Sequence, residues 1–431
     1  MDAIDFALRG EHITLEALLK ATGLASGGGA KALIAGGGAR VNGEAEVRRG
    51  RKLRAGDTVL VGQSHVRLQA GSSTVSADHL RGIQPIRQRL RGLGAGPEHQ
   101  THVLRRWLQA QPQDSGRRRI EDFLPLALRQ ALPTLVDDLA GLARLRSQHP
   151  GADGSARLLV ELGDGQTVES VLLPRGGLCV STQVGCAVGC VFCMTGQGGL
   201  LRQLGSAEIV AQVALARSLR PVNKVVFMGM GEPAHNLDNT MEAIELLGKE
   251  GAIGHKSIVF STVGDPRVFE HLQALRDGSV KPALALSLHT TKPALRTELL
   301  PRAPRIEPAE LIEAGERYAR ASGYPIQYQW TLLAGINDGD DEVDGIVTLL
   351  QGKYAIMNMI PYNSVDGLAF ERPSAERAAA MARALNQRGV LTKLRQSAGQ
   401  DVDAGCGQLR ARSLGRTRRI PIINARQESP P

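Results

Sequence analysis

From about residue 155 onward, short strand-forming runs alternate with longer helical segments, and this alternation constrains the fold more than any other feature of the sequence. Six runs are rich in β-branched and apolar residues: LCVST (178–182), VVFMG (225–229), SIVFST (257–262), LALSL (284–288), IQYQWTLL (326–333) and AIMNMIP (355–361). Repeated strand–helix units predict parallel strands with helices outside them. Six units are too few to close an eightfold barrel, so we expect an α/β fold with a partial (β/α)6 barrel.

Candidate site residues gather where these predicted strands end. Cysteines follow the first run, and Gly231 and Glu232 follow the second. The later runs end in, or are followed by, Ser261, Ser287, Leu288, His289 and Asn363. Because the carboxyl ends of parallel strands share one rim, where such folds bind their ligands, we expect these residues to line one site.

Three of these cysteines, Cys186, Cys190 and Cys193, form a C-x3-C-x2-C motif among glycines. Three thiolates can hold three irons of a [4Fe-4S] cluster and leave the fourth iron open for the amino and carboxylate groups of S-adenosylmethionine. One electron then cleaves the sulfonium to a deoxyadenosyl radical. A structural zinc site with Cys179 as fourth ligand is the alternative, although such sites usually use paired C-x2-C knuckles. The motif therefore favours an iron–sulfur cluster.

Residues 1–75 are predicted to form a separate small α+β domain. Helical spacing in 13–24 and a glycine-bounded helix in 28–37 precede Asn42-Gly43, a dipeptide typical of tight hairpins. A run of basic residues follows: Arg48, Arg49, Arg51, Lys52 and Arg54. The arrangement resembles the alpha-L RNA-binding domain, named after a small-subunit ribosomal protein. That resemblance implies RNA binding, with a merely solvated charge run as the alternative.

Two further segments complete the predicted organisation. The Ser/Gly-rich stretch 69–79 is typical of a linker, and 85–150 is arginine-rich and mostly helical, with Pro112 and Pro133 as breaks. We therefore expect an RNA-binding domain (1–75), a helical accessory domain (85–150), an α/β core (155–412) and a basic flexible tail (413–431).

Charge and cysteine content restrict the cellular setting. The formal net charge of +9 favours a polyanionic partner. Five cysteines, three of them clustered, do not suit a secreted disulfide framework, so a reducing cytoplasm is expected. The sequence has no apolar run long enough to span a membrane and no signal-peptide block at its N-terminus. We expect a cytoplasmic monomer that does not bind membranes.

Several motifs together resemble the RlmN/Cfr family of radical S-adenosylmethionine adenine methyltransferases: LCVSTQVGCAVGCVFCMTG, VVFMGMGEPAHNL, LSLHTT, MIPYN and VDAGCGQL. The similarity runs from about residue 85 to 412, and the alpha-L unit is an addition to the usual family architecture. It implies a radical-SAM barrel that carries one [4Fe-4S] cluster and consumes two S-adenosylmethionine molecules per turnover.

Further residues are expected to bind the cofactor. The backbone of Gly231 and the side chain of Glu232 would bind the amino group of S-adenosylmethionine. Its ribose, adenine and carboxylate would be held by Ser261, Ser287, Leu288, His289 and Asn363. A buried serine or asparagine is more often a structural residue, so each of these residues taken alone is weak evidence for cofactor binding.

The resemblance also assigns the two remaining cysteines and a carboxylate. Cys406 would accept a methyl group, and the radical would abstract a hydrogen from that S-methyl group. The resulting methylene radical would add to an adenine carbon, and Glu169 would accept the ring proton. Cys179 would then attack the sulfur of Cys406, releasing the methylated base and leaving a disulfide. The alternative is that both cysteines are small buried hydrophobic residues.

The family implies a target adenine in 23S rRNA or in tRNA, methylated at carbon 2 or carbon 8, and we expect carbon 2. A one-electron reductant and a disulfide reductant would be further partners. Lys292 and Trp330 differ from the residues that the family usually has at these positions, and they are expected near the substrate. Two alternatives stay open: a radical enzyme acting on another RNA or a non-RNA substrate, and an RNA-binding assembly factor with a structural metal.

Overall fold

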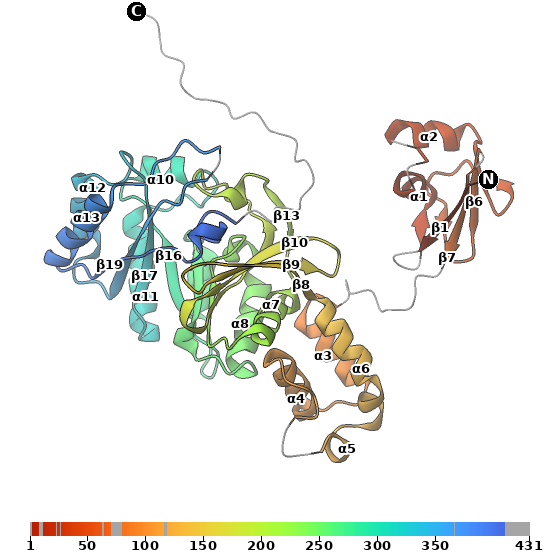
Figure 1. Ribbon diagram of the computed structural model, residues 1–431, viewed down its shortest axis with the longest axis horizontal. Coiled ribbons are helices and arrows are strands. Elements are labelled where there is room, and N and C mark those ends of the chain that lie inside the picture. Colours follow the sequence, from red (N-terminus) through yellow and green to blue (C-terminus); the bar gives the residue numbers. More distant parts are fainter. Residues whose placement is uncertain are drawn as a thin grey trace, which may run out of the picture. The chain divides into compact units, whose positions relative to one another are not determined.

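The chain divides into two compact units, Met1–His79 and Leu80–Pro431 (Figure 1). The computed structural model describes residues 2–7, 12–22, 24–25, 27–62, 64–69, 80–115, 119–365 and 367–409. Each unit has a hydrophobic core of its own. The predicted tail (413–431) and most of the predicted linker lie outside the described residues.

The first unit is a five-stranded sheet, ordered β1-β7-β6-β3-β4, together with two short helices and a small β2–β5 ladder. Its elements are β1 (Asp2–Ala7), β2 (Ile13–Thr14), α1 (Leu15–Ala21), α2 (Gly27–Ala35), β3 (Ala39–Val41), β4 (Glu44–Ala45), β5 (Lys52–Leu53), β6 (Thr58–Val61) and β7 (Ser64–Gln69). Leu15, Leu18 and Leu19 of α1 pack with Ile34 of α2 against the sheet, so the apolar spacing of both helices faces one core.

The predicted hairpin is confirmed, since Asn42-Gly43 connects β3 to β4 with φ angles of 52° and 88°. A two-residue hairpin turn needs such positive angles, which asparagine and glycine tolerate best. The Asn42 side chain accepts a hydrogen bond from the Thr58 N–H and donates one to Asp57, both at 2.8 Å. In the basic run that follows, Arg48 pairs with Glu46 at 2.8 Å.

The second unit begins with helices α3 (Ile83–Gly92), α4 (Pro97–Leu108), α5 (Ile120–Phe123) and α6 (Leu126–Gly141). Two predictions fail here. Helix α6 continues through Pro133, because Leu128, Leu132 and Leu135 on its buried side hold it against the core. Residues 143–150, predicted as helix, form a strand instead, because they pair with a long antiparallel neighbour whose hydrogen bonds outweigh local helix propensity.

A ten-stranded sheet, ordered β19-β18-β17-β16-β15-β14-β11-β10-β9-β8, forms the centre of this unit. Its strands are β8 (Ala143–Pro150), β9 (Ala156–Leu162), β10 (Thr167–Leu173), β11 (Gly177–Cys179), β14 (Lys224–Phe227), β15 (Ile258–Thr262), β16 (Ala283–Ser287), β17 (Ile326–Leu332), β18 (Ala355–Pro361) and β19 (Thr392–Leu394). From β11 to β19 all neighbours are parallel, whereas β8 to β10 are antiparallel. All six predicted strands are present, and β19 is a seventh parallel strand.

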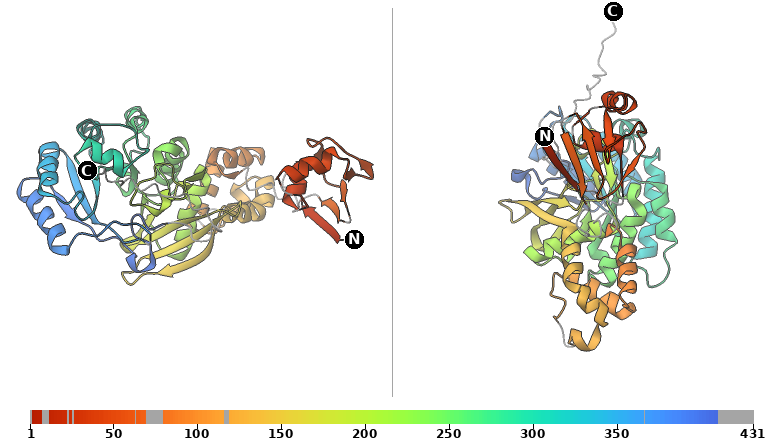
Figure 2. Two further views of the ribbon diagram at one scale, coloured as in Figure 1. Left: turned by 90° about the horizontal axis from the view of Figure 1, so that it is seen from above. Right: turned by 90° about the vertical axis from the view of Figure 1, so that its right-hand side faces the viewer.

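The sheet is open, with β19 and β8 at its opposite edges (Figure 1), so the predicted partial-barrel α/β class is confirmed. Because the parallel strands are added in chain order through right-handed crossovers, their helices fall on one face (Figures 1 and 2). These helices are α7 (Ser206–Leu219), α8 (Leu237–Lys249), α9 (Pro266–Gln273), α11 (Pro308–Ser322), α12 (Asp340–Leu350) and α13 (Ala375–Gln387). Helix α10 (Pro293–Leu299) instead lies at the carboxyl ends of the strands, where Arg296 donates to the Ser287 carbonyl. Within the described residues, none has the length and apolar character needed to cross a membrane.

The two faces of the sheet differ in chemistry. On β17, Tyr328, Trp330 and Leu332 are buried under the helices, whereas Gln327 and Gln329 alternate with them and are partly exposed. We call the side opposite the helices the open face. Cross-strand register places Cys179, Ser261, Ser287 and Gln329 on this open face.

The C-terminal segment 395–409 links the two edges of the sheet. It leaves β19 with a hydrogen bond from the Arg395 N–H to the Met359 carbonyl of β18. Asp401 then accepts a hydrogen bond from the Ala152 N–H, in the turn between β8 and β9, at 2.9 Å. The Gly407 carbonyl finally accepts one from the Met194 N–H at 2.7 Å. This segment therefore spans the open face and brings Gly407 to the cysteine motif.

Candidate active site

The three motif cysteines lie in one compact loop between β12 (Gln183–Gly185) and β13 (Leu200–Gln203). The Cys186 N–H donates to the Gly199 carbonyl at 3.0 Å, and a β-carbon on Gly185 would lie 2.0 Å from that same oxygen. The Val191 N–H donates to the Leu299 carbonyl of α10 at 3.1 Å. Glycines thus let the loop fold back on itself, and α10 holds it in place.

The thiols lie near enough to influence one another. Burial, together with the nearby charges of Glu232 and Cys193, raises the pKa of Cys186 to about 12. Burial also raises the pKa of Cys190, as do the charges of Cys193 and Cys186. Among the described residues, no three His, Cys, Asp or Glu side chains converge on one point as ligands of a single ion do. In a [4Fe-4S] cluster each thiolate binds a different iron, so the three thiols do not have to converge on one point. The set of three thiols fits such a cluster.

Gly231 and Glu232 lie beside this loop, after β14. Gly231 has φ of 105°, and a β-carbon there would lie 2.7 Å from the Gln183 side chain, so only glycine lets the backbone pass so close. The buried Glu232 carboxylate accepts hydrogen bonds from the Ala234 N–H at 3.0 Å and the Val263 N–H at 3.1 Å. Burial raises the pKa of Glu232 to about 7. This carboxylate could receive the ammonium group of a bound ligand.

His289 follows β16 in the left-handed region, with φ of 63°. Its Nδ1 accepts a hydrogen bond from the Thr331 N–H at 3.0 Å, which leaves the proton of the neutral ring on Nε2. Burial, and then the charge of Arg296, lowers the pKa of His289 to about 3. The Phe192 ring meets the imidazole edge-on at 5.0 Å. Ser261 and Ser287 lie at the ends of β15 and β16, and Leu288 is buried behind them.

Asn363 joins the strand rim to the C-terminal segment. Its amide donates to the Ser397 hydroxyl at 2.8 Å and to the Cys406 carbonyl at 3.0 Å. Its Oδ1 is buried and has no hydrogen-bond partner within the described chain. An unsatisfied buried acceptor is costly unless a ligand supplies the missing donor. This oxygen fits a site that a polar ligand completes.

Cys406 and Cys179 are neighbours, although they lie far apart in the sequence. Burial, and then the charge of Cys406, raises the pKa of the Cys179 thiol. Surrounding protein atoms raise the pKa of Cys406, Ser397 lowers it by a hydrogen bond, and Cys193 raises it again. Solvent still reaches Cys406, whereas Cys179 is buried. Cys406 thus lies near Cys193 of the cysteine loop as well as near Cys179.

Glu169 lies on the same face as Cys179, because β10 pairs with β11 through Val171 and Cys179. It is fully buried and forms an ion pair with Arg157 at 2.6 Å. The Ser181 hydroxyl donates to the Glu169 carbonyl at 2.6 Å and accepts a hydrogen bond from the Met230 N–H at 2.8 Å. One buried hydroxyl therefore ties the Glu169 strand to the Gly231 loop.

Sequence reasoning missed Arg296 of α10. The side chain is buried, and it donates to the carbonyls of Val263 at 2.5 Å and Ser287 at 3.2 Å. Its Nε lacks a hydrogen-bond partner in the described part of the chain. Arg296 is close enough to Cys190 and His289 to interact with them electrostatically. An arginine at helical spacing beside Leu299 looks like a solvated surface residue, so no sequence signal identified it.

Lys292 and Trp330, the two residues that differ from those usual in the RlmN/Cfr family, lie in different places. Trp330 is fully buried on the helix-covered face, where its indole donates to the Asn337 carbonyl at 3.2 Å, so its predicted place near the substrate is wrong. The side chain of Lys292, at the start of α10, pairs with Asp341. Strand alternation explains the position of Trp330, because its neighbours Gln329 and Thr331 take the open face.

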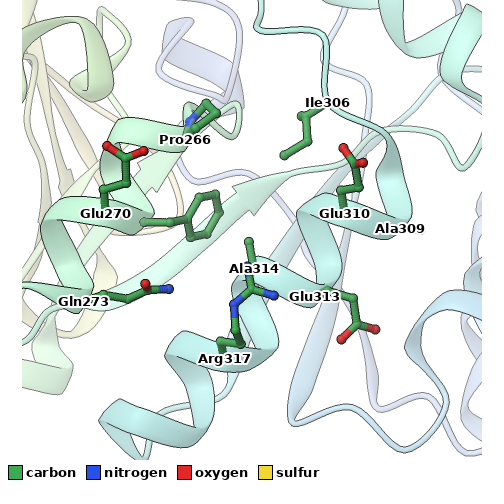
Figure 3. A pocket seen from close by; sticks show the side chains of 10 residues that line it. Pro266, Glu270, Gln273, Ile306, Ala309, Glu310, Glu313, Ala314 and Arg317 are labelled. Carbon is green, nitrogen blue, oxygen red and sulfur yellow. The ribbon is translucent and has the colours of Figure 1, made fainter.

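A cavity of about 550 Å³ lies elsewhere, between α9 and α11 (Figure 3). Glu270 and Gln273 line one side of it, and Glu310 and Arg317 line the other (Figure 3). No predicted site residue borders this cavity, which belongs to the outer helical layer.

Known proteins share both parts of this architecture. Residues 6–69 match the S4 domain family, and residues 180–349 match the Radical SAM superfamily. A probable RNA methyltransferase from Methylibium petroleiphilum is 74% identical over 340 residues, covering 79% of this chain and 96% of that protein. A probable RNA methyltransferase from Leptothrix cholodnii is 72% identical over 341 residues, covering 79% and 97%. The crystal structure of a radical SAM methyltransferase from Sphaerobacter thermophilus is 33% identical, with a TM-score of 0.66, and the match covers 77% of this chain and 98% of that one.

Proposed function

Because this chain belongs to the radical SAM RNA methyltransferase family and carries an S4 domain before the shared core, we propose that it methylates carbon 2 of an adenine in 23S rRNA or tRNA. The family implies a [4Fe-4S] cluster and S-adenosylmethionine as cofactors. The observation that carries the finer proposal is the neighbourhood of Cys406, Cys179 and Cys193, which supports two reactive thiols beside a cluster site.

We propose that Cys186, Cys190 and Cys193 bind the cluster and that Gly231 and Glu232 hold the amino group of S-adenosylmethionine. When bound, the cluster and S-adenosylmethionine supply a carbon radical that can attack a poorly nucleophilic ring carbon. The remaining cofactor contacts would come from Ser261, Ser287, Leu288, His289 and Asn363. The unpaired Oδ1 of Asn363 supports its part, because it lacks only a donor.

The thiols would act in sequence. Cys406, which solvent reaches, would take the methyl group on its sulfur, and that carbon would then bond to the adenine ring. Glu169 would accept the proton that the ring carbon loses. The Cys179 thiolate would attack the Cys406 sulfur, so that the bond from sulfur to the transferred carbon breaks and a disulfide remains for an external reductant. The released carbon would take up one proton to complete the methyl group, and the unpaired electron left by the radical addition would return to the cluster. Two S-adenosylmethionine molecules would be consumed per methyl group transferred.

The test uses anaerobically reconstituted protein, S-adenosylmethionine with a trideuterated methyl group, and unmodified 23S rRNA and tRNA, with digested nucleosides read by mass spectrometry. We expect label in 2-methyladenosine with two deuterons on the new methyl group, because one is abstracted. Cys406→Ala should abolish this label and leave the iron content unchanged. Label in 8-methyladenosine would overturn the carbon assignment. An unlabelled adenosine pool, with S-adenosylmethionine still cleaved, would overturn the substrate assignment.

A further inference from the structure

Three cations on the open face have no part in the catalytic scheme above. Lys224 begins β14, and the register of Gly177 with Lys224 puts it on the face that Cys179 occupies two residues further along. Lys393 of β19 lies beside Asn358 of β18 on the same face. Arg395 follows β19, and its Nε donates to the Asn358 side-chain oxygen at 2.9 Å.

These cations lie close together without a counter-charge. Burial lowers the pKa of Lys224, and the charges of Arg395 and Lys393 lower it further. Across the described residues, none of the three forms an ion pair with a carboxylate. Other cations of this unit do, as Arg202 does with Asp164 and Arg388 with Asp344. A group of positive charges without a counter-charge favours an anionic ligand.

One of these cations, Arg395, is also connected to the segment that carries the proposed methyl-accepting thiol. Arg395 is two residues before Ser397, whose hydroxyl accepts a hydrogen bond from Asn363, and Asn363 in turn donates to the Cys406 carbonyl. A base that reaches Cys406 must bring its own sugar and flanking phosphates. Lysine and arginine contacts to phosphate fix the register of a nucleic acid without reading its sequence.

We propose that Lys224, Lys393 and Arg395 form a phosphate-binding subsite that holds the RNA backbone at the target nucleotide. This subsite rests on the proposed RNA methyltransferase function and deepens it. It assigns to the second unit the task of positioning the target nucleotide after that nucleotide has left the RNA stack. The S4 unit would then supply general RNA affinity, whereas these three side chains would set the register of one base over Cys406.

The test compares two triple variants of the full-length, cluster-loaded protein: K224Q/K393Q/R395Q, and K256Q/R276Q/R383Q as a control. The control removes three exposed cations that lie off the open face, with the same change in net charge. The readouts are the KM for the RNA that the wild type methylates, at several salt concentrations, the iron content, and S-adenosylmethionine cleavage without RNA. Each phosphate contact contributes about 0.7 to the slope of log affinity against log salt for single strands.

We expect the subsite variant to raise KM by at least about tenfold at moderate salt and to lower the salt slope by about 2, following from three lost contacts. Its iron content and RNA-independent cleavage should match the wild type. A slope equal to that of the control overturns the subsite while the proposed function stands. Failure of the wild type to methylate either RNA overturns the proposed function itself.

A single variant covers the case in which the triple variant loses iron or unfolds. Lys393→Gln changes one exposed side chain at the edge strand and should lower the slope by about 0.7. Arg395→Lys keeps the charge and should keep the slope. An unchanged slope in Lys393→Gln overturns the subsite.

Discussion

At the scale of the single residue, burial keeps the His289 side chain uncharged. The ring is enclosed between Phe192 and β17, and its pKa is lowered to about 3 by burial and by Arg296. The imidazole therefore stays neutral at working pH, and its Nε2–H can donate to a ligand acceptor such as an adenine nitrogen. Its positive φ, uncommon for a residue with a β-carbon, turns the chain at the strand end so that the ring faces inward.

His289→Gln tests this charge state through pH-dependent stability. A histidine whose pKa is lower in the folded state contributes full stability above its unfolded value of 6.5, and loses that contribution as pH falls toward 3. From pH 7.5 to 5, the wild type should lose about 2 kcal/mol through this residue, and His289→Gln should not. Urea unfolding followed by fluorescence of the two tryptophans, Trp107 and Trp330, reports on the second unit. An identical pH dependence in both proteins would contradict the assignment.

The cysteine loop shows how backbone geometry prepares a site at the scale of the element. Three thiols can lie near one another only because the loop turns back at Gly185 and Gly196. At Gly196 a β-carbon would lie 2.8 Å from the Gly189 α-carbon. The glycines that made this stretch look like a flexible loop are therefore required by close packing.

Gly185→Ala should prevent cluster incorporation, because the new methyl group cannot fit 2.0 Å from the Gly199 carbonyl oxygen. We expect less than about a tenth of the wild-type iron per chain after anaerobic reconstitution, and the matching loss of visible absorbance. Gly198→Ala is the matched control in the same loop, since a β-carbon there meets nothing within 4 Å. Equal iron content in the two variants would refute the steric argument.

At the scale of the whole molecule, the chain is divided into two units that have separate hydrophobic cores. The relatives match about four-fifths of this chain, and the S4 match occupies residues 6–69. RNA affinity and chemistry are thus expected to separate along the chain. Within the first unit, Arg49, Lys52 and Arg54 are exposed and form no ion pair among the described residues, so they can meet phosphates.

Deleting residues 1–75 should leave iron content and RNA-independent S-adenosylmethionine cleavage unchanged, because the second unit keeps its own core. The RNA dissociation constant, measured by filter binding, should rise at least about tenfold. In the full chain, R49Q/K52Q/R54Q should reproduce most of that loss, which separates the effect of charge from that of deletion. Unaltered affinity in both variants would show that the first unit does not bind this RNA.

The parts of the fold that were predictable are those set by local pattern. All six predicted strands are present because apolar runs bounded by turns report buried parallel strands directly. The rim residues follow from the same pattern, because the ends of parallel strands share an edge. Strand β8 and the passage of α6 through Pro133 were not predictable, since each depends on a partner distant in the sequence: β9 for the strand, and the apolar core for the helix.

The sequence by itself determined the separate N-terminal domain, the α/β class and the identity of the cysteine motif, because spacing and periodicity are properties of the chain itself. Only the tertiary structure decided that segment 395–409 spans the open face and brings Cys406 beside Cys179. It alone placed Arg296 against the cysteine loop and gathered Lys224, Lys393 and Arg395. The reason is physical: burial and charge neighbourhoods arise between residues that the chain separates and packing joins.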